Sequence, residues 1–588
     1  MRKSNKLMQA VMAGILLFTF SGCATNSVSS ATNSSQNVSS ENTNGSSTNS
    51  TPTNPSTASG VTTLTQSVIS KELKSKDYEI DYDENSSTKI NLLNDQINFS
   101  GDGVLVKDKT VTINKAGTYI IDGNLENGQI IVDVDKTEDV RIVLNGVNIH
   151  NESSTAIYVK SADKLVMTLK EGTINTLSGG DNYINIYDNN IDGVIFSKDD
   201  LTINGNGQLN LTSNYKHAIV SKNDLNIVSG IFNIVSADQG LSGKDSVRIY
   251  GGVFNIKSNG QGIRSKNEEE LEKGNIYIAG GNFEIESVQD AMNATGSVVI
   301  DDGVFNIKTD DDGIHADVEA VINSGDINIL ESYEGIEGYR VIINGGNINI
   351  SSSDDGINAS NPNVTSNEPA GGRNLPQGNN STDVTNTLNN NPAPPNDGMM
   401  RNGGGRGPMM ADENVYITIN DGNIVIDAQG DGIDSNGNIT INNGNILVSS
   451  KSDNGENALD YDGNITINGG ILIGVGGSPM HQNLNENSSQ PSISYNVSNG
   501  NGNDVELKDS NSNVIVSWKA PKTYNSIFIT HPSLKLNEKY TLVSGTESID
   551  ITIDNLLTTN ITRGSGGRGQ RPPRSEEFQP SMEPTNVQ

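Results

Sequence analysis

The sequence predicts an all-β protein whose main part is a right-handed parallel β-helix, with about 22 residues and three strands per coil and a small C-terminal β cap. Short runs of Ile, Val and Leu recur at a nearly constant spacing, and Asn-Gly, Asp-Gly and Gly-Gly steps separate them. The chain of 588 residues contains 62 glycines but only 5% aromatic residues. Many turns and few large side chains suit stacked thin coils better than one bulky core.

Residues 1–23 have the order of a bacterial export signal, with basic residues first, then an apolar run over 7–20, then small residues. The run of about fourteen apolar residues is shorter than the roughly twenty that span a bilayer. Ser21, Gly22 and Cys23 resemble a lipobox, so we predict cleavage before Cys23 and its acylation. The alternative is a secreted protein with an incidental thiol. The expected location is extracellular, with the cell membrane contacted only through the lipid anchor.

Residues 24–65 are rich in Ser, Thr and Asn and are predicted to form a disordered linker, because they offer too little apolar surface to offset the entropy of ordering. Residues 66–97 form a lead-in that could include a short helix or strand. The chain has one cysteine, which excludes an intramolecular disulfide. A formal charge of −32 disfavours nucleic acid as a partner and favours cations.

The β-helix is predicted over residues 98–477 by a repeat of apolar positions. Leu225, Ile227, Phe232, Ile234 and Leu241 return 22 residues later as Val247, Ile249, Phe254, Ile256 and Ile263. Each unit reads as a strand, a glycine turn, a second strand and a third short strand at a Gly-Ile step, and coils stack about 4.8 Å apart. A calcium β-roll is disfavoured because its nine-residue repeat is absent, and a left-handed hexapeptide helix because the period is not a multiple of six.

Two insertions interrupt the period just after the Gly-Ile strand, and both therefore enter at the same corner of the coil. One spans 266–272 and is rich in Glu; the other spans 361–411, is rich in Asn, Pro, Gly and Met, and is predicted to be disordered. Residues 492–557 are predicted to form an antiparallel β segment that caps the open end of the stack. Residues 562–588 read as a disordered tail.

Carboxylates recur beside the Gly-Ile step, which predicts a column of acidic side chains along one edge of the stack. Two unit charges about 4.8 Å apart repel by roughly 0.9 kcal/mol in water, so a shared Ca²⁺, which prefers oxygen ligands, would stabilise such a column. The predicted metal ligands are Asp290, Asp310, Asp311, Asp312, Glu334, Glu337, Asp354, Asp355, Asp431, Asp434 and Asp460. The alternative is ordinary corner chemistry without a metal. Zinc is not expected, because His315 is the lone histidine in the column.

Four further side chains near the column are candidates for contact with a ligand. Tyr333 and Tyr339 could stack on sugar rings, and Arg264 and Arg340 are basic residues close to the column by period. A third basic residue at this distance is Lys308. Tyrosine at such positions also serves as simple corner packing.

The stretches NGVNIHNESSTAIYVKSADKLVMTLKEGTINTL and GVIFSKDDLTINGNGQLNLTSNYKHAIVSKNDLNI, with the later Asp-Gly-Ile coils, resemble the clostridial cell-surface carbohydrate-binding β-helix family. The resemblance covers roughly residues 77–555. It implies a right-handed β-helix with pectate-lyase-like topology that binds calcium and plant-wall polysaccharides, such as cellulose or acidic pectin-like chains, without catalysis. The insertion at 361–411 departs from the family pattern and could cover or extend the binding face.

Three functions remain open from the sequence. The first is calcium-dependent, non-catalytic binding of polysaccharide by a monomer at the cell surface. The second is a calcium-dependent pectate lyase, which would need Lys or Arg beside the metal as a base. The third is a structural adhesin or spacer that contacts protein.

Overall fold

The computed structural model describes residues 72–561, apart from 95, 185–190, 271, 362–410, 453–455, 478–483 and 502–503. The chain divides into two compact units, 1–63 and 64–588, and every described residue belongs to the second. The expected signal, Cys23, the linker, nearly all of the 361–411 insertion and the tail lie outside the described residues. Among the described residues no helix is long and apolar enough to cross a membrane.

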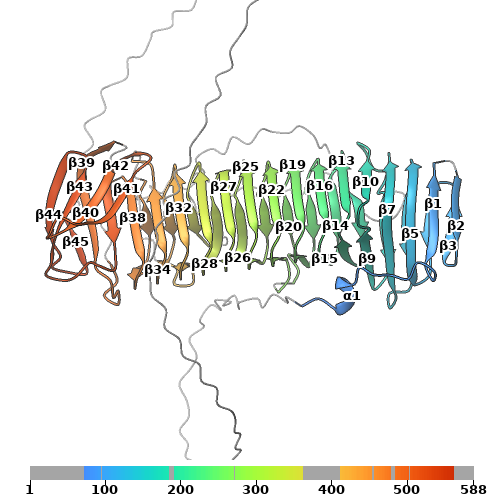
Figure 1. Cartoon of the computed structure of the whole chain (residues 1–588), viewed down its shortest axis with the longest axis horizontal. Helices are drawn as coiled ribbons and strands as arrows, with labels where there is room; N and C mark the ends of the chain where they lie inside the picture. The colour runs from blue at the N-terminus through green and yellow to red at the C-terminus, as the bar shows by residue number, and fades with distance from the viewer. Residues whose placement is uncertain are drawn as a thin grey trace, which may run out of the picture. The chain divides into compact units, whose positions relative to one another are not determined.

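Parallel strands stack coil upon coil through most of the second unit, so the predicted parallel β-helix is confirmed (Figure 1). Neighbouring coils are joined by three ladders of hydrogen-bonded strands, which we call the first, second and third ladder. The first ladder runs through β1 (Thr88–Leu93), β5 (Gly117–Glu126), β7 (Asp139–Asn151), β10 (Ile174–Gly179), β13 (Gln208–Ser213), β16 (Ile231–Ser236), β19 (Val253–Ser258), β22 (Asn282–Ser287), β25 (Val304–Thr309), β27 (Asp326–Ser332), β29 (Asn347–Ser352), β32 (Asn423–Ala428), β35 (Asn445–Ser449) and β38 (Ile471–Gly476).

The second ladder includes the first halves of β5 and β7, which pair with each other, and continues through β9 (Lys164–Leu169), β12 (Asp200–Gly205), β15 (Asp224–Ile227), β18 (Ser246–Ile249), β21 (Asn275–Ile278), β24 (Ser297–Ile300), β26 (Ile314–Ile322), β28 (Ile336–Ile343), β31 (Tyr416–Ile419), β34 (Asn438–Ile441) and β37 (Ile465–Ile467). The third ladder contains the Gly-Ile steps. It runs through β4 (Thr110–Ile113), β6 (Gln129–Asp133), β8 (Ile157–Ser161), β11 (Gly193–Ser197), β14 (His217–Ser221), β17 (Leu241–Gly243), β20 (Ile263–Ser265), β23 (Met292–Ala294), β26, β28, β30 (Ile357–Ala359), β33 (Ile433–Ser435) and β36 (Leu459–Tyr461).

The register of these ladders is the one that the apolar repeat predicts. Leu225 pairs with Val247 and Leu241 with Ile263, each 22 residues on. Ile357 pairs with Ile433 across the long insertion, so the insertion leaves the stack at one corner and returns to the next coil in register.

The core is a set of stacked apolar rows inside the coils. In the first ladder, inward positions of β16, β19, β22 and β25 hold four phenylalanines whose adjacent ring centroids lie 4.9, 4.7 and 4.6 Å apart. Glycine precedes these strands for a steric reason: at Gly303, φ is 136° and a Cβ would lie 2.8 Å from the ring of Phe305.

Both ends of the stack are covered. At the N-terminal end, β1 pairs in parallel with β5 and antiparallel with β2 (Gln96–Ser100), so the β-helix begins before the expected boundary at residue 98. The strand β3 (Val104–Lys107) pairs with β4. The lead-in contains the short helix α1 (Ser75–Tyr78), held by an ion pair of 2.8 Å between Asp77 and Lys164, both almost fully buried.

The C-terminal end carries the predicted β cap. The strand β42 (Thr523–Thr530) pairs antiparallel with β38 and with β39 (Ser492–Asn501), and β39 pairs with β45 (Leu557–Thr559). A separate sheet contains β40 (Asp504–Asp509), β41 (Val514–Lys519), β43 (Lys539–Ser544) and β44 (Glu547–Thr552). Because β42 occupies the free edge of β38, the last parallel strand does not expose an unpaired edge there.

Candidate functional site

The third ladder places the predicted acidic residues above one another on successive coils. The position after the isoleucine reads Ser242, Arg264, Asn293, His315, Glu337, Asn358, Asp434 and Asp460, and each of these residues pairs with the next. The position before the glycine is aligned in the same way by backbone hydrogen bonds, for example from Gly313 N to Glu334 O and from Gly356 N to Asp431 O. We call the carboxylates on these coils from Asp290 to Asp460 the acidic column.

Some carboxylates of the column accept hydrogen bonds from the backbone at the corner of the coil. Backbone N–H groups donate to the carboxylate one coil earlier, from Asp312 to Asp290 Oδ1 at 3.2 Å and from Glu334 to Asp312 Oδ1 at 3.1 Å. The same contact recurs from Asp431 to Asp355 Oδ1 at 2.7 Å. Each contact satisfies a backbone donor at the corner and uses only one carboxylate oxygen.

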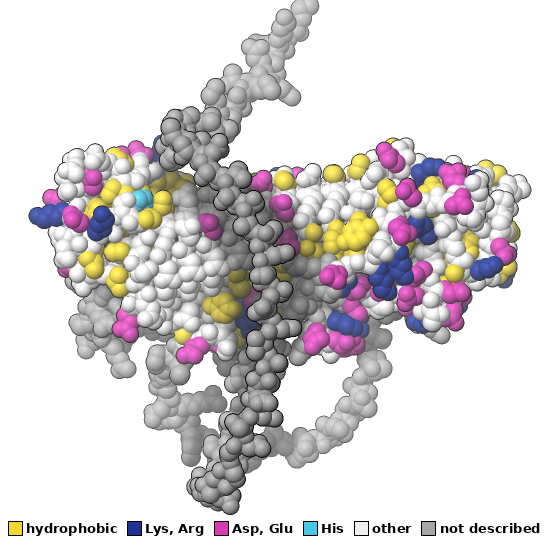
Figure 2. Space-filling view, turned by 60° about the horizontal axis from the view of Figure 1, so that its bottom comes forward, with side chains coloured by type: hydrophobic (Ala, Val, Ile, Leu, Met, Phe, Trp, Pro, Cys, Tyr) yellow, Lys and Arg dark blue, Asp and Glu magenta, His cyan; other side chains and the backbone are white. Residues whose placement is uncertain are grey.

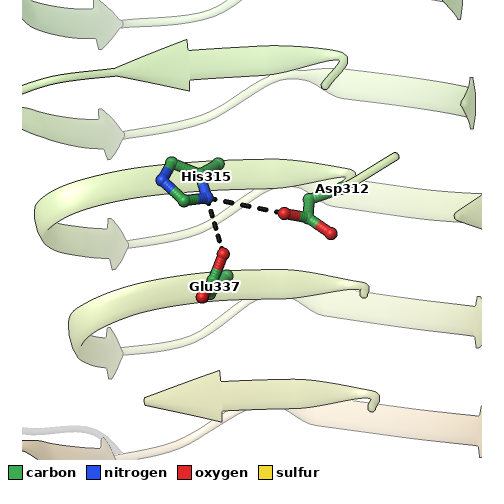
Figure 3. Close-up of side chains that lie close together, drawn as sticks. All are labelled: Asp312, His315 and Glu337. Atoms are coloured by element: carbon green, nitrogen blue, oxygen red, sulfur yellow. Dashed lines mark ion pairs between the residues drawn. The ribbon is translucent and has the colours of Figure 1, made fainter. Parts of the chain in front are cut away.

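The first half of the column contains its own cation. His315 lies between carboxylates of two coils, 3.4 Å from Asp312 and 2.6 Å from Glu337 (Figure 3). It also lies 3.0 Å from Asp317. Burial alone would lower the pKa of His315, but these carboxylates raise it far above its usual range. His315 in turn holds the pKa of Glu337 below its usual range despite burial. Asp317 was not among the predicted site residues.

Neighbouring carboxylates of this first half are less well balanced. Burial, and secondarily the charge of Asp312, raises the pKa of Asp290 to about 7. Burial, and then the charge of Glu337, raises the pKa of Glu334 to about 10, although the amide of Asn358 donates to both of its oxygens at 3.1 Å. The Oδ1 atom of Asn358 is buried and accepts no hydrogen bond from any described group. Oxygens of Asp290, Asp311 and Asp312 lie within 4.8 Å of one another.

The second half of the column is a cluster of Asp355, Asp431, Asp434 and Asp460, which we call the C-terminal cluster. Oxygens of the last three lie within 4.8 Å of one another. Burial, and secondarily the neighbouring charges, raises the pKa of Asp434 to about 8 and the pKa values of Asp355 and Asp431 to about 7. Within the described residues, no Lys, Arg or His forms an ion pair with Asp355, Asp431 or Asp434.

A hard divalent cation fits the C-terminal cluster. Oxygens bound to one Ca²⁺ lie about 2.4 Å from it, and therefore up to about 4.8 Å from one another. Carboxylates that ionise only against mutual repulsion gain most from such an ion. Asp431, Asp434 and Asp460 would hold the ion, with Asp355 beside them. The ion would supply a positive centre for an anionic ligand group.

Other predicted site residues lie apart from these clusters or are inaccessible. Asp310 is exposed and belongs neither to the group of Asp290, Asp311 and Asp312 nor to the C-terminal cluster. Asp354 lies beside Asp355, and the charge of Asp354 contributes to the raised pKa of Asp355. Tyr333 is half-buried. Tyr339 and Arg340 are 7% and 8% exposed, so little of either side chain is accessible to a ligand. Arg340 instead lies 3.9 Å from Glu319 and packs over the rings of Tyr339 and Tyr416.

Comparison with known proteins finds similarity in the first part of the β-helix. A family model described as "Carbohydrate-binding domain-containing protein" matches residues 107–368. A curated relative of that description from Acetivibrio thermocellus is 40% identical over 147 residues, which are 24% of this chain and 51% of the relative. This chain thus spans about half the length of that relative.

A solved structure is also similar. It is described as a polysaccharide lyase-like protein from C. thermocellum, in a gadolinium derivative; it is 32% identical to this chain, covers 45% of it and is itself covered to 93%, with a TM-score of 0.35. These matches agree with the resemblance predicted from the sequence: residues 107–368 of this chain are similar to carbohydrate-binding domain-containing proteins.

Proposed function

We propose that this protein binds extracellular polysaccharide without cleaving it, and that Ca²⁺ in the acidic column takes part. The family match over residues 107–368 carries the carbohydrate part of this proposal. We further propose plant-wall chains, acidic pectin-like or cellulose, as the ligand class, and a monomer as the binding unit.

The calcium part is carried by the C-terminal cluster, of which Asp431, Asp434 and Asp460 lie outside the matched segment. The pKa values of Asp355, Asp431 and Asp434 are raised, and no Lys, Arg or His among the described residues forms an ion pair with these three, whereas His315 already balances charge in the first half of the column. Ca²⁺ takes six to eight ligands, so an ion held by three or four carboxylates keeps positions for a uronate carboxylate. An acidic protein can hold an acidic glycan in this way.

The geometry favours binding over lyase chemistry. A lyase needs a basic side chain within hydrogen-bond reach of the substrate proton beside the metal. Arg340 is buried against Glu319, and Lys308 lies on β25 in the first ladder rather than the third. His315 is engaged by three carboxylates. Tyr333 remains a candidate for stacking on a sugar ring.

We also propose that Cys23 carries the lipid that keeps the protein at the cell surface. The residues that support this proposal are the export signal and the lipobox-like Ser21-Gly22-Cys23. Labelling with a fatty-acid analogue in a lipoprotein-processing host, with Cys23→Ser as control, tests it. A label that persists in Cys23→Ser contradicts it.

Retention on insoluble polysaccharide tests the binding function. Purified protein is mixed with insoluble pectate or cellulose, with Ca²⁺ or with EDTA, and the bound fraction is measured. We expect retention with Ca²⁺ and less with EDTA. Release of ultraviolet-absorbing unsaturated ends from soluble polygalacturonate would instead establish a lyase. If the protein is retained on neither polysaccharide, with Ca²⁺ or with EDTA, the proposal is contradicted and a structural adhesin is favoured.

A further inference from the structure

A groove of opposite character precedes the acidic column on the same ladder. It lies on the coils of β14, β17 and β20 and has a volume of about 350 Å³, within the range of ligand sites. Lys222, Lys244, Arg264 and Lys266 line it, and we call it the basic groove. Its acidic lining residues are Asp192, Glu268 and Glu269. In a chain with 71 acidic and 39 basic residues, such a gathering of cations is unusual.

The three lysines form a ladder of their own. Lys222, Lys244 and Lys266 each follow directly after a strand of the third ladder, and Ser221, Gly243 and Ser265 before them are paired in register. Their backbones therefore repeat at the coil spacing of about 4.8 Å. Figure 2 shows most Lys and Arg side chains on the N-terminal, right-hand part of the visible face, intermixed with carboxylates. A row of cations at regular spacing matches a polymer that carries an anion on successive units.

Arg264 occupies the column position between Ser242 and Asn293. Its Nε atom is buried and has no hydrogen-bond partner among the described residues. A buried donor without an acceptor is costly, and a guanidinium prefers carboxylate or sulfate-like oxygens. Arg264 therefore lies in the same row of third-ladder positions as the acidic column, and it also lines the basic groove.

The acidic insertion places its own carboxylates beside two of the three lysines. Glu269 lies 2.7 Å from Lys244 and Glu268 lies 2.5 Å from Lys266. The glutamate side chains are 76% and 70% exposed, and such exposed ion pairs contribute little to stability. A ligand anion could therefore displace them at small cost.

We propose that the basic groove binds an anionic stretch of polysaccharide, with Arg264 as the central contact and the lysines paired to its charged groups. Glu268 and Glu269 occupy Lys266 and Lys244 in the free protein and compete with that ligand, and Lys222 lies 3.9 Å from Asp192. The inference rests on the proposed function only in taking the ligand to be a polysaccharide. Its contacts require no calcium, which separates it from the C-terminal cluster.

Calorimetric titration in EDTA at low salt tests the proposal. The probes are hexagalacturonate, a sulfated cellohexaose and neutral cellohexaose, so that carboxylate and sulfate are distinguished. We expect binding of at least one anionic probe, none of the neutral probe, and weakening as NaCl is added. No binding of either anionic probe in EDTA would overturn the proposal; calcium-dependent retention on polysaccharide would then still support the proposed function.

Paired variants locate the site. Lys244→Ala with Arg264→Ala should weaken binding by about tenfold or more. Lys257→Ala with Lys308→Ala removes the same charge from exposed positions on β19 and β25 of the first ladder and should leave affinity unchanged. An equal loss of affinity in the two double variants would mean general electrostatic attraction and would overturn the assignment of the ligand to the basic groove. Since Arg264 is partly buried, Lys244→Ala alone is measured as well and should also weaken binding.

The insertion provides a test of opposite sign. Glu268→Gln with Glu269→Gln frees the lysines and should tighten binding of the anionic probe in EDTA. A purely structural role for the two glutamates predicts no such gain. Unchanged or weaker binding in this variant would overturn the competition between the insertion and the ligand.

Discussion

A protonated histidine supplies one of the cations that the acidic column needs. His315 contacts Asp312, Asp317 and Glu337 from adjoining coils, and its pKa is raised far above its usual range. The sequence analysis expected a shared Ca²⁺ to stabilise the column, but in this half a histidine of the chain itself supplies positive charge. The amide of Asn293 also stabilises a carboxylate of this half, because it donates a hydrogen bond to Asp290 Oδ2 at 2.6 Å.

His315→Gln should destabilise the protein by about 2–4 kcal/mol at pH 7, because the carboxylates lose a partly buried cation. Because the pKa of His315 is raised, the imidazole stays charged through neutral pH. Because the pKa of Glu337 is lowered, the ion pair is lost only when the pH falls through the folded-state pKa of Glu337 and its carboxylate is protonated. The difference from wild type should therefore shrink in acid. Urea unfolding at pH 7 and pH 3.5 measures it.

The matched control is His150→Gln, whose ring lies 3.1 Å from the exposed Glu152. This variant should cost less than about 0.5 kcal/mol at either pH. A cost for His315→Gln that does not depend on pH would contradict the ion-pair account.

Asp200 gives a pH effect away from the acidic column. Burial, and secondarily the charge of Asp224, raises the pKa of Asp200 to about 6. A carboxyl whose pKa is higher folded than unfolded lowers stability as pH rises from about 4 to about 6. Asp200→Asn should therefore be more stable than wild type by roughly 1–2 kcal/mol at pH 7 and equal to it at pH 3.5, by thermal unfolding at both pH values. Equal stabilisation at both would contradict this.

At the scale of strands, the phenylalanine row shows what holds one coil on the next. Phe283 stacks on Phe254 at 4.7 Å and on Phe305 at 4.6 Å. Phe283→Ala should cost about 3–5 kcal/mol, because it opens a cavity in the middle of the row. Val304→Ala, at an outward position of the neighbouring strand that is 41% exposed, should cost less than about 0.5 kcal/mol. Urea unfolding of both variants makes the comparison, and similar costs would contradict the assigned faces.

The period of the sequence predicted the strand register, because a one-residue slip would turn every apolar side chain outward. It could not predict the corner of the coil between Gly338 and Arg340, where β28 continues from the third ladder into the second without a break. The register between β26 and β28 shifts after Ala316, so that this coil is shorter at the corner. The tighter turn buries Tyr339 and Arg340, which the repeat pattern alone had left beside the column.

Across the whole described stack, charge on the third ladder changes sign along the chain. The basic groove precedes Asp290, His315 balances the next coils, and Asp355, Asp431 and Asp434 of the C-terminal cluster form no ion pair with a Lys, Arg or His of the described residues. The order of residue types was visible in the sequence. Which carboxylates meet a cation was not, because Asp317 and the insertion glutamates come from outside the repeated positions.

Calcium should stabilise the protein by mass action, by about 2.7 kcal/mol at a hundred times Kd, which thermal melting detects. Asp434→Asn should raise stability in the absence of Ca²⁺ and reduce the stability gained from Ca²⁺. In EDTA the variant should be more stable than wild type by roughly 1–3 kcal/mol at pH 8.5, since the raised pKa of Asp434 marks a charge that the fold disfavours. With Ca²⁺ the variant should gain much less than wild type, because one ligand is lost.

The control for this pair of effects is Asp302→Asn, at an exposed turn outside the column, which should change neither melting in EDTA nor the calcium response. An Asp434→Asn protein that melts below wild type in EDTA and responds equally to calcium would show that the C-terminal cluster serves as a corner contact. Greater stability without the ion together with a smaller response to it has one physical reading. The carboxylates of Asp431, Asp434 and Asp460 are then held close at a cost to the fold that a bound cation reverses.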